Sequence, residues 1–129
     1  MKTELKLRID WSELDLFGHV NNVMYAKYMQ AARVNFMDQI GIMKSYHDHK
    51  IGFMVAATSV IYLKPLFYPG EVLIRTHVKE IKNTSFILMH EIYDSKSQLA
   101  STGEDVIVYY DFNTNQKQLI GADLKLVLS

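Results

Sequence analysis

The chain has 129 residues, with 14 basic and 14 acidic side chains and a formal net charge of zero. A neutral chain has no broad positive field for a polyanion, so we expect no nucleic-acid partner, and its length fits one domain over residues 1–129. It has no cysteine, which excludes disulfides, thiolate metal sites and a cysteine nucleophile. No run of about 18 apolar residues occurs, and the first residues lack the apolar core of a signal peptide. We therefore expect a cytoplasmic protein with no membrane partner.

The N-terminal segment predicts a strand. From Leu5 to Trp11 apolar residues alternate with charged ones, which is the period of a strand with one buried face. Residues 12–22 break this alternation and contain Gly18, which indicates a loop that leads into a helix.

Residues 23–40 predict a long helix, because apolar side chains recur there every three or four positions. Asn21 or Asn22 is placed to cap its start, and Gly41 stands where a left-handed C-terminal cap is expected. Residues 42–50 predict a short second helix.

The second half of the chain predicts strands. Residues 53–63 are nearly all apolar, which suits a central strand covered on both faces. Alternation continues through residues 72–79 and 86–93, residues 100–111 form the last long strand, and the tail that follows is weakly patterned. One long helix followed by four strands predicts an α+β domain, with an antiparallel sheet wrapped around one long central helix.

A carboxylate precedes the long helix by a few residues. Gly18, between Asp15 and the helix, permits a positive φ or a close approach of the backbone to a ligand. First-turn amides lack partners within the helix and carry partial positive charge, so they suit an oxyanion. Asp15 would then attack a thioester carbonyl or activate water, in an acyl-transfer reaction. The residues alone favour the alternative, an Asp15 that only complements the helix dipole, because acidic residues are common before helices.

This stretch resembles the acyl-CoA thioesterases of the 4-hydroxybenzoyl-CoA thioesterase-like hotdog family. The family pattern is an acidic residue, an Asp, Gly-His-Val-Asn-Asn, a Tyr and an Ala-Arg pair. The matching positions are Glu13, Asp15, Gly18, His19, Val20, Asn21, Asn22, Tyr25, Ala32 and Arg33. Weaker matches are Lys64-Pro65, Pro69-Gly70-Glu71, Ser85 and the closing strand at residues 100–110. The sequence departs from the pattern at Glu13, commonly Asp, and at Gln30, often Glu.

The resemblance implies a single hotdog thioesterase domain that forms homodimers or homotetramers with a joined sheet and with active sites between subunits. It implies an acyl-CoA or acyl-carrier-protein substrate, with coenzyme A present only as part of substrate or product and no other cofactor. It assigns catalysis to Asp15, with an oxyanion amide near Asn22. Thr58 and Ser59 of the partner subunit would complete the site.

The remaining candidates each have a structural alternative. His19 suits a bond to substrate, orientation of Asp15 or fixation of the loop. We group it with the catalytic residues Asp15 and Asn22, and we assign the substrate contacts to Gly18, Val20, Tyr25, Thr58, Ser59, Lys64 and Lys82. The basic residues that suit coenzyme A phosphates, or else a solvated sheet face, are Lys64, Arg75, Lys79 and Lys82.

Two further motifs predict structure rather than chemistry. Arg33, on the long helix, is expected to pair with an acidic residue. His47, Asp48 and His49 look like metal ligands, but residues two apart do not share a helix face, so we expect no metal site.

Two other functions remain open. A non-catalytic acyl-CoA-binding hotdog domain would use the same groove without turnover. A hotdog enoyl-thioester hydratase or dehydratase would use a catalytic histidine, for which His19 is the candidate. Fold alone does not choose among these, because hotdog domains host several activities.

Overall fold

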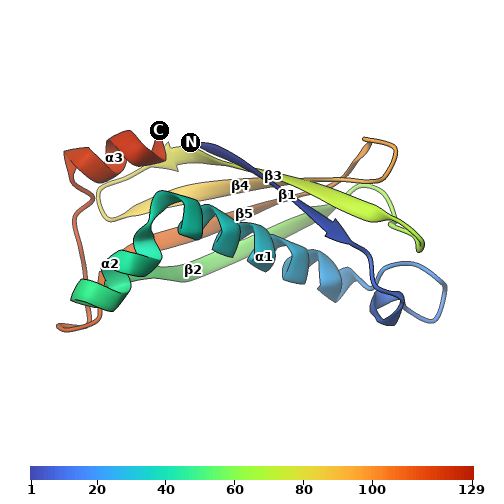
Figure 1. The fold of residues 1–129 in the computed structure, drawn as a ribbon, viewed down its shortest axis with the longest axis horizontal. Helices are drawn as coiled ribbons and strands as arrows, with labels where there is room; N and C mark the ends of the chain where they lie inside the picture. The colour runs from blue at the N-terminus through green and yellow to red at the C-terminus, as the bar shows by residue number, and fades with distance from the viewer.

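The structure is a computed structural model that describes residues 1–129. The chain forms one antiparallel sheet with a long helix across it (Figure 1). In chain order the elements are β1 (Lys2–Arg8), the 3-10 turn η1 (Trp11–Glu13), α1 (Asn22–Ile40), α2 (Ile42–His49), β2 (Ile51–Tyr62), β3 (Glu71–Ile81), β4 (Ser85–Tyr93), β5 (Leu99–Asp111), β6 (Gln116–Lys117) and α3 (Ala122–Leu128). No helix combines the length and the apolar character needed to cross a bilayer.

The sheet is antiparallel throughout, with strand order β1-β3-β4-β5-β2 and the short β6 paired to β5. Helix α1 packs mainly on β1, β3 and β4, so its apolar stripe covers one half of the sheet. This arrangement confirms the predicted α+β hotdog fold, with an antiparallel sheet around one long helix.

Helix α1 begins and ends as its sequence predicts. The Asn21 side chain accepts a hydrogen bond from the Val23 N–H at 3.0 Å, so Asn21 is the cap and Asn22 is the first helical residue. At the other end Gly41 has φ 79°, the left-handed conformation that glycine adopts without strain. The face between these caps buries Tyr25, Tyr28, Met29, Ala32, Phe36 and Met37.

The core consists of two hydrophobic clusters separated by a polar belt. One cluster, near the start of α1, contains Tyr25, Ile74 and Ile92, whereas the other, near its end, contains Phe36 and Leu88. Between them lie Thr76, His90 and Asp105, all buried on the helix-facing side of β3, β4 and β5. The sheet is therefore not uniformly apolar beneath the helix.

The prediction of a central strand at residues 53–63 is wrong for the single subunit. β2 is the outermost strand, and most of its residues are exposed on both faces. An apolar run alone does not distinguish an edge strand from a central one.

One smaller prediction also fails, and one segment without a prediction forms a helix. Trp11 does not continue the first strand, because β1 ends at Arg8 and Trp11 lies 71% exposed in η1. The tail, which lacks a clear pattern, forms α3, whose buried Leu128 completes the second cluster. Leu124 and Leu128 are the α3 residues that pack on this cluster, and two positions on a short helix are too few for a period to show.

Candidate active site

The loop before α1 folds back on the Asp15 carboxylate. Its Oδ1 accepts hydrogen bonds from the Phe17 N–H at 2.9 Å and the His19 N–H at 3.1 Å. The Asp15 N–H donates to the His19 carbonyl at 2.6 Å, which closes the loop from the other side. Gly18 has φ 81° inside this turn, so it adopts the positive φ that the sequence allows. The carboxylate is thus held in one orientation, and its Oδ2 has no hydrogen-bond partner within the chain.

The first turn of α1 leaves one amide free beside that carboxylate. The Val23 N–H is capped by the Asn21 side chain, and the Met24 N–H donates to the Asn21 carbonyl at 2.9 Å. The Asn22 N–H donates to no group in the chain, as expected for the first helical residue. It therefore remains available to an external acceptor at the positive end of the helix.

Asp15 and Asn22 line the same open cavity, of about 350 Å³. Helix α1 contributes Asn22 and Tyr25, and the segment at the end of β2 contributes Tyr62. Its full lining is Asp15, His19, Val20, Asn22, Tyr25, Tyr62, Leu63, Lys64 and Pro65. The structure thus brings six predicted site residues together: Asp15, His19, Val20, Asn22, Tyr25 and Lys64.

Sequence reasoning missed Tyr62, Leu63 and Pro65 at this cavity. The Tyr62 hydroxyl donates to the Asn22 carbonyl at 3.3 Å, so it helps to fix the start of α1. The sequence does offer one signal for these residues, since they stand where the apolar run of β2 ends, next to the predicted site residue Lys64.

The buried Glu13 supports the loop from below. Its carboxylate accepts hydrogen bonds from the Tyr28 hydroxyl at 2.8 Å, the Asp10 N–H at 2.8 Å and the Lys27 ammonium at 3.1 Å. Burial raises the pKa of Glu13, but these donors outweigh it and hold the pKa below its usual value. Glu13 therefore ties the turn before Asp15 to the buried face of α1, and it does not face the cavity.

His19 and Lys64 lie at the cavity with different contacts. The His19 ring meets Phe67 edge to face, 5.2 Å between centroids, and its nitrogens bond no backbone group. It is the His19 backbone that fixes the loop. The Lys64 ammonium donates to the Gln98 side chain, which lines a neighbouring cavity together with Lys64.

Four predicted substrate-contacting residues do not line this cavity: Gly18 lies in the turn that holds Asp15, and the other three lie elsewhere in the subunit. Thr58 and Ser59 are on β2, outside the cavity, where a second copy could present them. Lys82 follows β3, whose other end at Glu71 lies toward the Asp15 loop. The eleven residues of β3 span ~35 Å, so the structure does not bring Lys82 into this site.

A buried polar network beneath α1 was only partly foreseen. The Asp105 carboxylate accepts from Arg33 Nη1 at 3.0 Å and from the Thr58 hydroxyl at 2.8 Å, and it lies 2.8 Å from His90 Nε2. The predicted acidic partner of Arg33 is therefore Asp105. Thr76 completes the chain of contacts, with its hydroxyl 2.8 Å from His90 Nδ1. The signals in the sequence were His90 and Asp105, each at an inward-facing position of a strand.

Burial raises the pKa of Asp105, but hydrogen bonds from His90, Thr58 and Arg33 outweigh it and hold that pKa below its usual value. No side chain in this network touches the Asp15 cavity. The structure contains no group of three histidine, cysteine or acidic side chains arranged to hold a metal ion.

Comparison with known proteins places this geometry in context. Residues 9–128 match the thioesterase-like superfamily. The long-chain acyl-CoA thioesterase FadM of Escherichia coli (strain K12) is 23% identical over 97% of this chain and 94% of its own length. A chloroplastic acyl-acyl carrier protein thioesterase of Arabidopsis thaliana is 34% identical over 60% of this chain and 42% of its own length. The solved structure of a gentisyl-coenzyme A thioesterase superposes with a TM-score of 0.84 at 25% identity, covering 98% of this chain and 100% of that one.

Proposed function

The chain belongs to the thioesterase-like superfamily and is a thioester hydrolase, and on that premise we propose that it hydrolyses an acyl-CoA at the cavity between Asp15 and the start of α1. One observation carries the proposal: the oriented Asp15 carboxylate and the unpartnered Asn22 amide line the same cavity. The Asp15 carboxylate can attack the thioester carbonyl or deprotonate water. The Asn22 N–H can stabilise, by hydrogen bonding, the negative charge that develops on the carbonyl oxygen.

The chemistry divides between these two groups. The thioester carbonyl oxygen accepts a hydrogen bond from the Asn22 N–H, at the positive end of α1. In one route the free Asp15 Oδ2 attacks the carbonyl carbon and the C–S bond breaks. The thiolate leaves and takes a proton, and water then hydrolyses the acyl anhydride on Asp15. In the other route Asp15 removes a proton from water, the water oxygen attacks, and the proton passes to the leaving sulfur. Both yield the free acid and coenzyme A.

The surrounding residues hold the substrate. Val20 and Tyr25 line the cavity, and the Tyr25 hydroxyl donates to the Lys64 carbonyl at 3.0 Å. Gly18 contributes through the turn that orients Asp15. Lys64 is the one lysine or arginine that lines this cavity, so we assign a contact with the phosphates of coenzyme A to it rather than to Lys82. The exposed edge strand β2 suits pairing with a second copy, which would supply Thr58 and Ser59 of the partner subunit.

The relatives differ in the carrier of the acyl group, since one is named for coenzyme A and another for acyl carrier protein. We propose coenzyme A as the carrier because the relative named for coenzyme A matches 97% of this chain over 94% of its own length, whereas the relative named for acyl carrier protein matches 60%. A hydratase would require His19 to act on the acyl chain, whereas its ring packs on Phe67 and the loop presents Asp15.

The test is thiol release from a panel of acyl-CoA esters by the wild type and Asp15→Asn. Asparagine keeps the oxygen that accepts from the loop amides, so the loop stays folded while the reactive carboxylate is lost. We expect the rate to fall by at least ~100-fold. Asp48→Asn, on the exposed side of α2, is the matched control and should retain the wild-type rate. Equal rates for the wild type and Asp15→Asn would contradict the mechanism. Tight binding of acyl-CoA without turnover by the wild type would instead identify a binding domain.

A further inference from the structure

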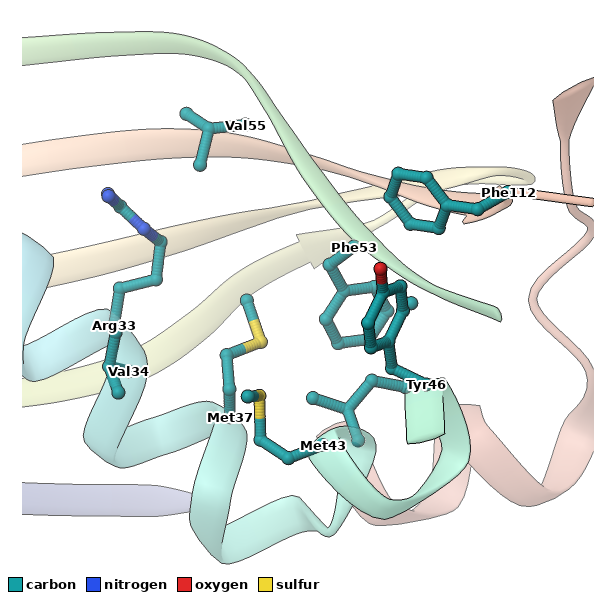
Figure 2. A pocket seen from close by; sticks show the side chains of 10 residues that line it. Arg33, Val34, Met37, Met43, Tyr46, Phe53, Val55 and Phe112 are labelled. Atoms are coloured by element: carbon teal, nitrogen blue, oxygen red, sulfur yellow. The ribbon is translucent and has the colours of Figure 1, made fainter. Parts of the chain in front are cut away.

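A second cavity, of about 340 Å³, lies at the other end of the long helix, between α1, α2 and β2 (Figure 2). Eight of its ten lining residues are hydrophobic. Met37 of α1 and Met43 of α2 point into it from below, and Phe53, Tyr46 and Phe112 surround its far side. Its size is within the range of small-molecule sites, and flexible methionines adapt to an apolar occupant.

This cavity has no free charge for a polar ligand. Its one charged residue is Arg33, whose guanidinium is bound to the buried Asp105 at 3.0 Å. A ligand with a carboxylate or phosphate would have to break that buried ion pair, which is unfavourable. The cavity therefore suits a neutral apolar group.

The two cavities lie along the same face of α1. Asn22 lines the Asp15 cavity, and Arg33 and Met37 line the apolar one. Spacings of 11 and 15 residues keep all three within ~60° around a helix of 3.6 residues per turn. Ala26, small and exposed, lies on that face between them.

Strand β2 forms the other wall of both cavities. Tyr62 lines the first, and Phe53 and Val55 line the second. Between them, residues 56–59 carry small side chains that are all exposed, so no bulky residue of β2 blocks the way. The surface between the two cavities is thus lined by exposed residues of α1 and β2, and beneath it the buried Asp105 carboxylate ties Arg33 to Thr58.

From these observations, and resting on the proposed function, we infer that the substrate is a thioester with a long aliphatic acyl chain, whose far end occupies the apolar cavity. The helix rises ~16 Å from Asn22 to Arg33. A single aromatic ring attached to the carbonyl is too short to span that distance, whereas a long flexible chain reaches it. Burial of the chain end would then favour long substrates over short ones.

The experiment compares acyl chain lengths in the wild type and in variants that fill the cavity. Val34→Trp and Met43→Trp add bulk from α1 and α2 at positions that are partly exposed, so the core is not overpacked. Val127→Trp, partly exposed on α3, is the matched control away from the cavity. We expect kcat/KM for palmitoyl-CoA to fall by at least about tenfold in both cavity variants. Butyryl-CoA hydrolysis should stay at the wild-type level, and the control should leave both substrates unchanged.

The inference is overturned if the wild type prefers short or aromatic esters, or if the cavity variants slow every ester equally. It is also overturned if these variants alter only the oligomeric state, measured by sedimentation, because the cavity would then be a contact between copies. If the wild type hydrolyses no ester, the proposed function fails, and calorimetric titration with palmitoyl-CoA still tests the cavity. Weaker binding by Val34→Trp than by Val127→Trp would support the inference, and equal binding would overturn it.

Discussion

Arg33 on α1 and Asp105 on β5 form an ion pair inside the core, with 3.0 Å between Nη1 and Oδ2. Asp105 is fully buried, and it also accepts from Thr58 on the edge strand and contacts His90 on β4. The Asp105 carboxylate therefore links α1 to strands β2, β4 and β5 in the region between the two cavities. Every polar side-chain atom buried there has a partner.

Removal of that carboxylate should destabilise the protein strongly. Asp105→Ala leaves the Arg33 guanidinium and His90 in the core without an acceptor, so we expect the free energy of unfolding to fall by ~3–5 kcal/mol. Asp38→Ala, on the exposed side of α1, should change it by less than ~0.5 kcal/mol. Urea denaturation of both variants measures the difference. A loss in Asp105→Ala no larger than in the control would contradict a structural role for the network.

The same residue should make stability depend on pH in the acid range. The pKa of Asp105 is lower in the folded chain than its ordinary value of 3.8. On acidification the unfolded chain therefore takes up the proton first. The contribution of Asp105 to the free energy of unfolding is fully present above the ordinary pKa of 3.8 and is lost as the pH falls through the lower pKa of the folded chain. Unfolding of the wild type and Asp105→Asn, measured from neutral pH into this range, should show the wild-type advantage shrinking on acidification. A constant advantage would show that the charge of Asp105 does not matter.

Glu13 should support both stability and activity. Glu13→Ala removes the acceptor of the Tyr28 hydroxyl and the Asp10 amide, so we expect a loss of ~1–3 kcal/mol in the free energy of unfolding. The turn before Asp15 would loosen, and thioester hydrolysis should fall even at temperatures where the variant is folded. Glu4→Ala removes an exposed partner of Arg75 and should cost less than ~1 kcal/mol with no loss of rate. Full activity in folded Glu13→Ala would separate Glu13 from the site.

The parts of this molecule that the sequence predicted are those governed by local rules. The period of α1, its Asn21 cap and its Gly41 terminus depend on neighbours within a few residues. The positions of β2 and Trp11 were not predictable, because an apolar run has the same appearance on an edge strand as in the middle of a sheet.

The candidate site divides in the same way. Asp15, Gly18 and Asn22 are close in sequence, so their juxtaposition could be predicted from the loop and the helix start. Tyr62 of this site, and Asp105 of the separate buried network, lie on strands far away in the sequence. Their positions depend on the sheet register, which one sequence does not specify. The apolar cavity combines α1, α2 and β2 and had no local signal at all.

Gly18 provides the sharpest local test of the site. A Cβ at Gly18 or at Gly121 would meet no atom within 4 Å, so neither substitution by alanine causes a clash. The two glycines differ in backbone conformation, with φ 81° at Gly18 and −76° at Gly121. Gly18→Ala must therefore bear a left-handed conformation, which costs ~1–2 kcal/mol, whereas Gly121→Ala, at the N-cap of α3, bears no such strain and should cost less. Any relaxation of the strained turn shifts the Phe17 and His19 amides that hold Asp15, so hydrolysis should fall in folded Gly18→Ala and not in Gly121→Ala. Thermal unfolding and thiol release on the two variants measure both effects, and equal rates would show that the turn does not position Asp15.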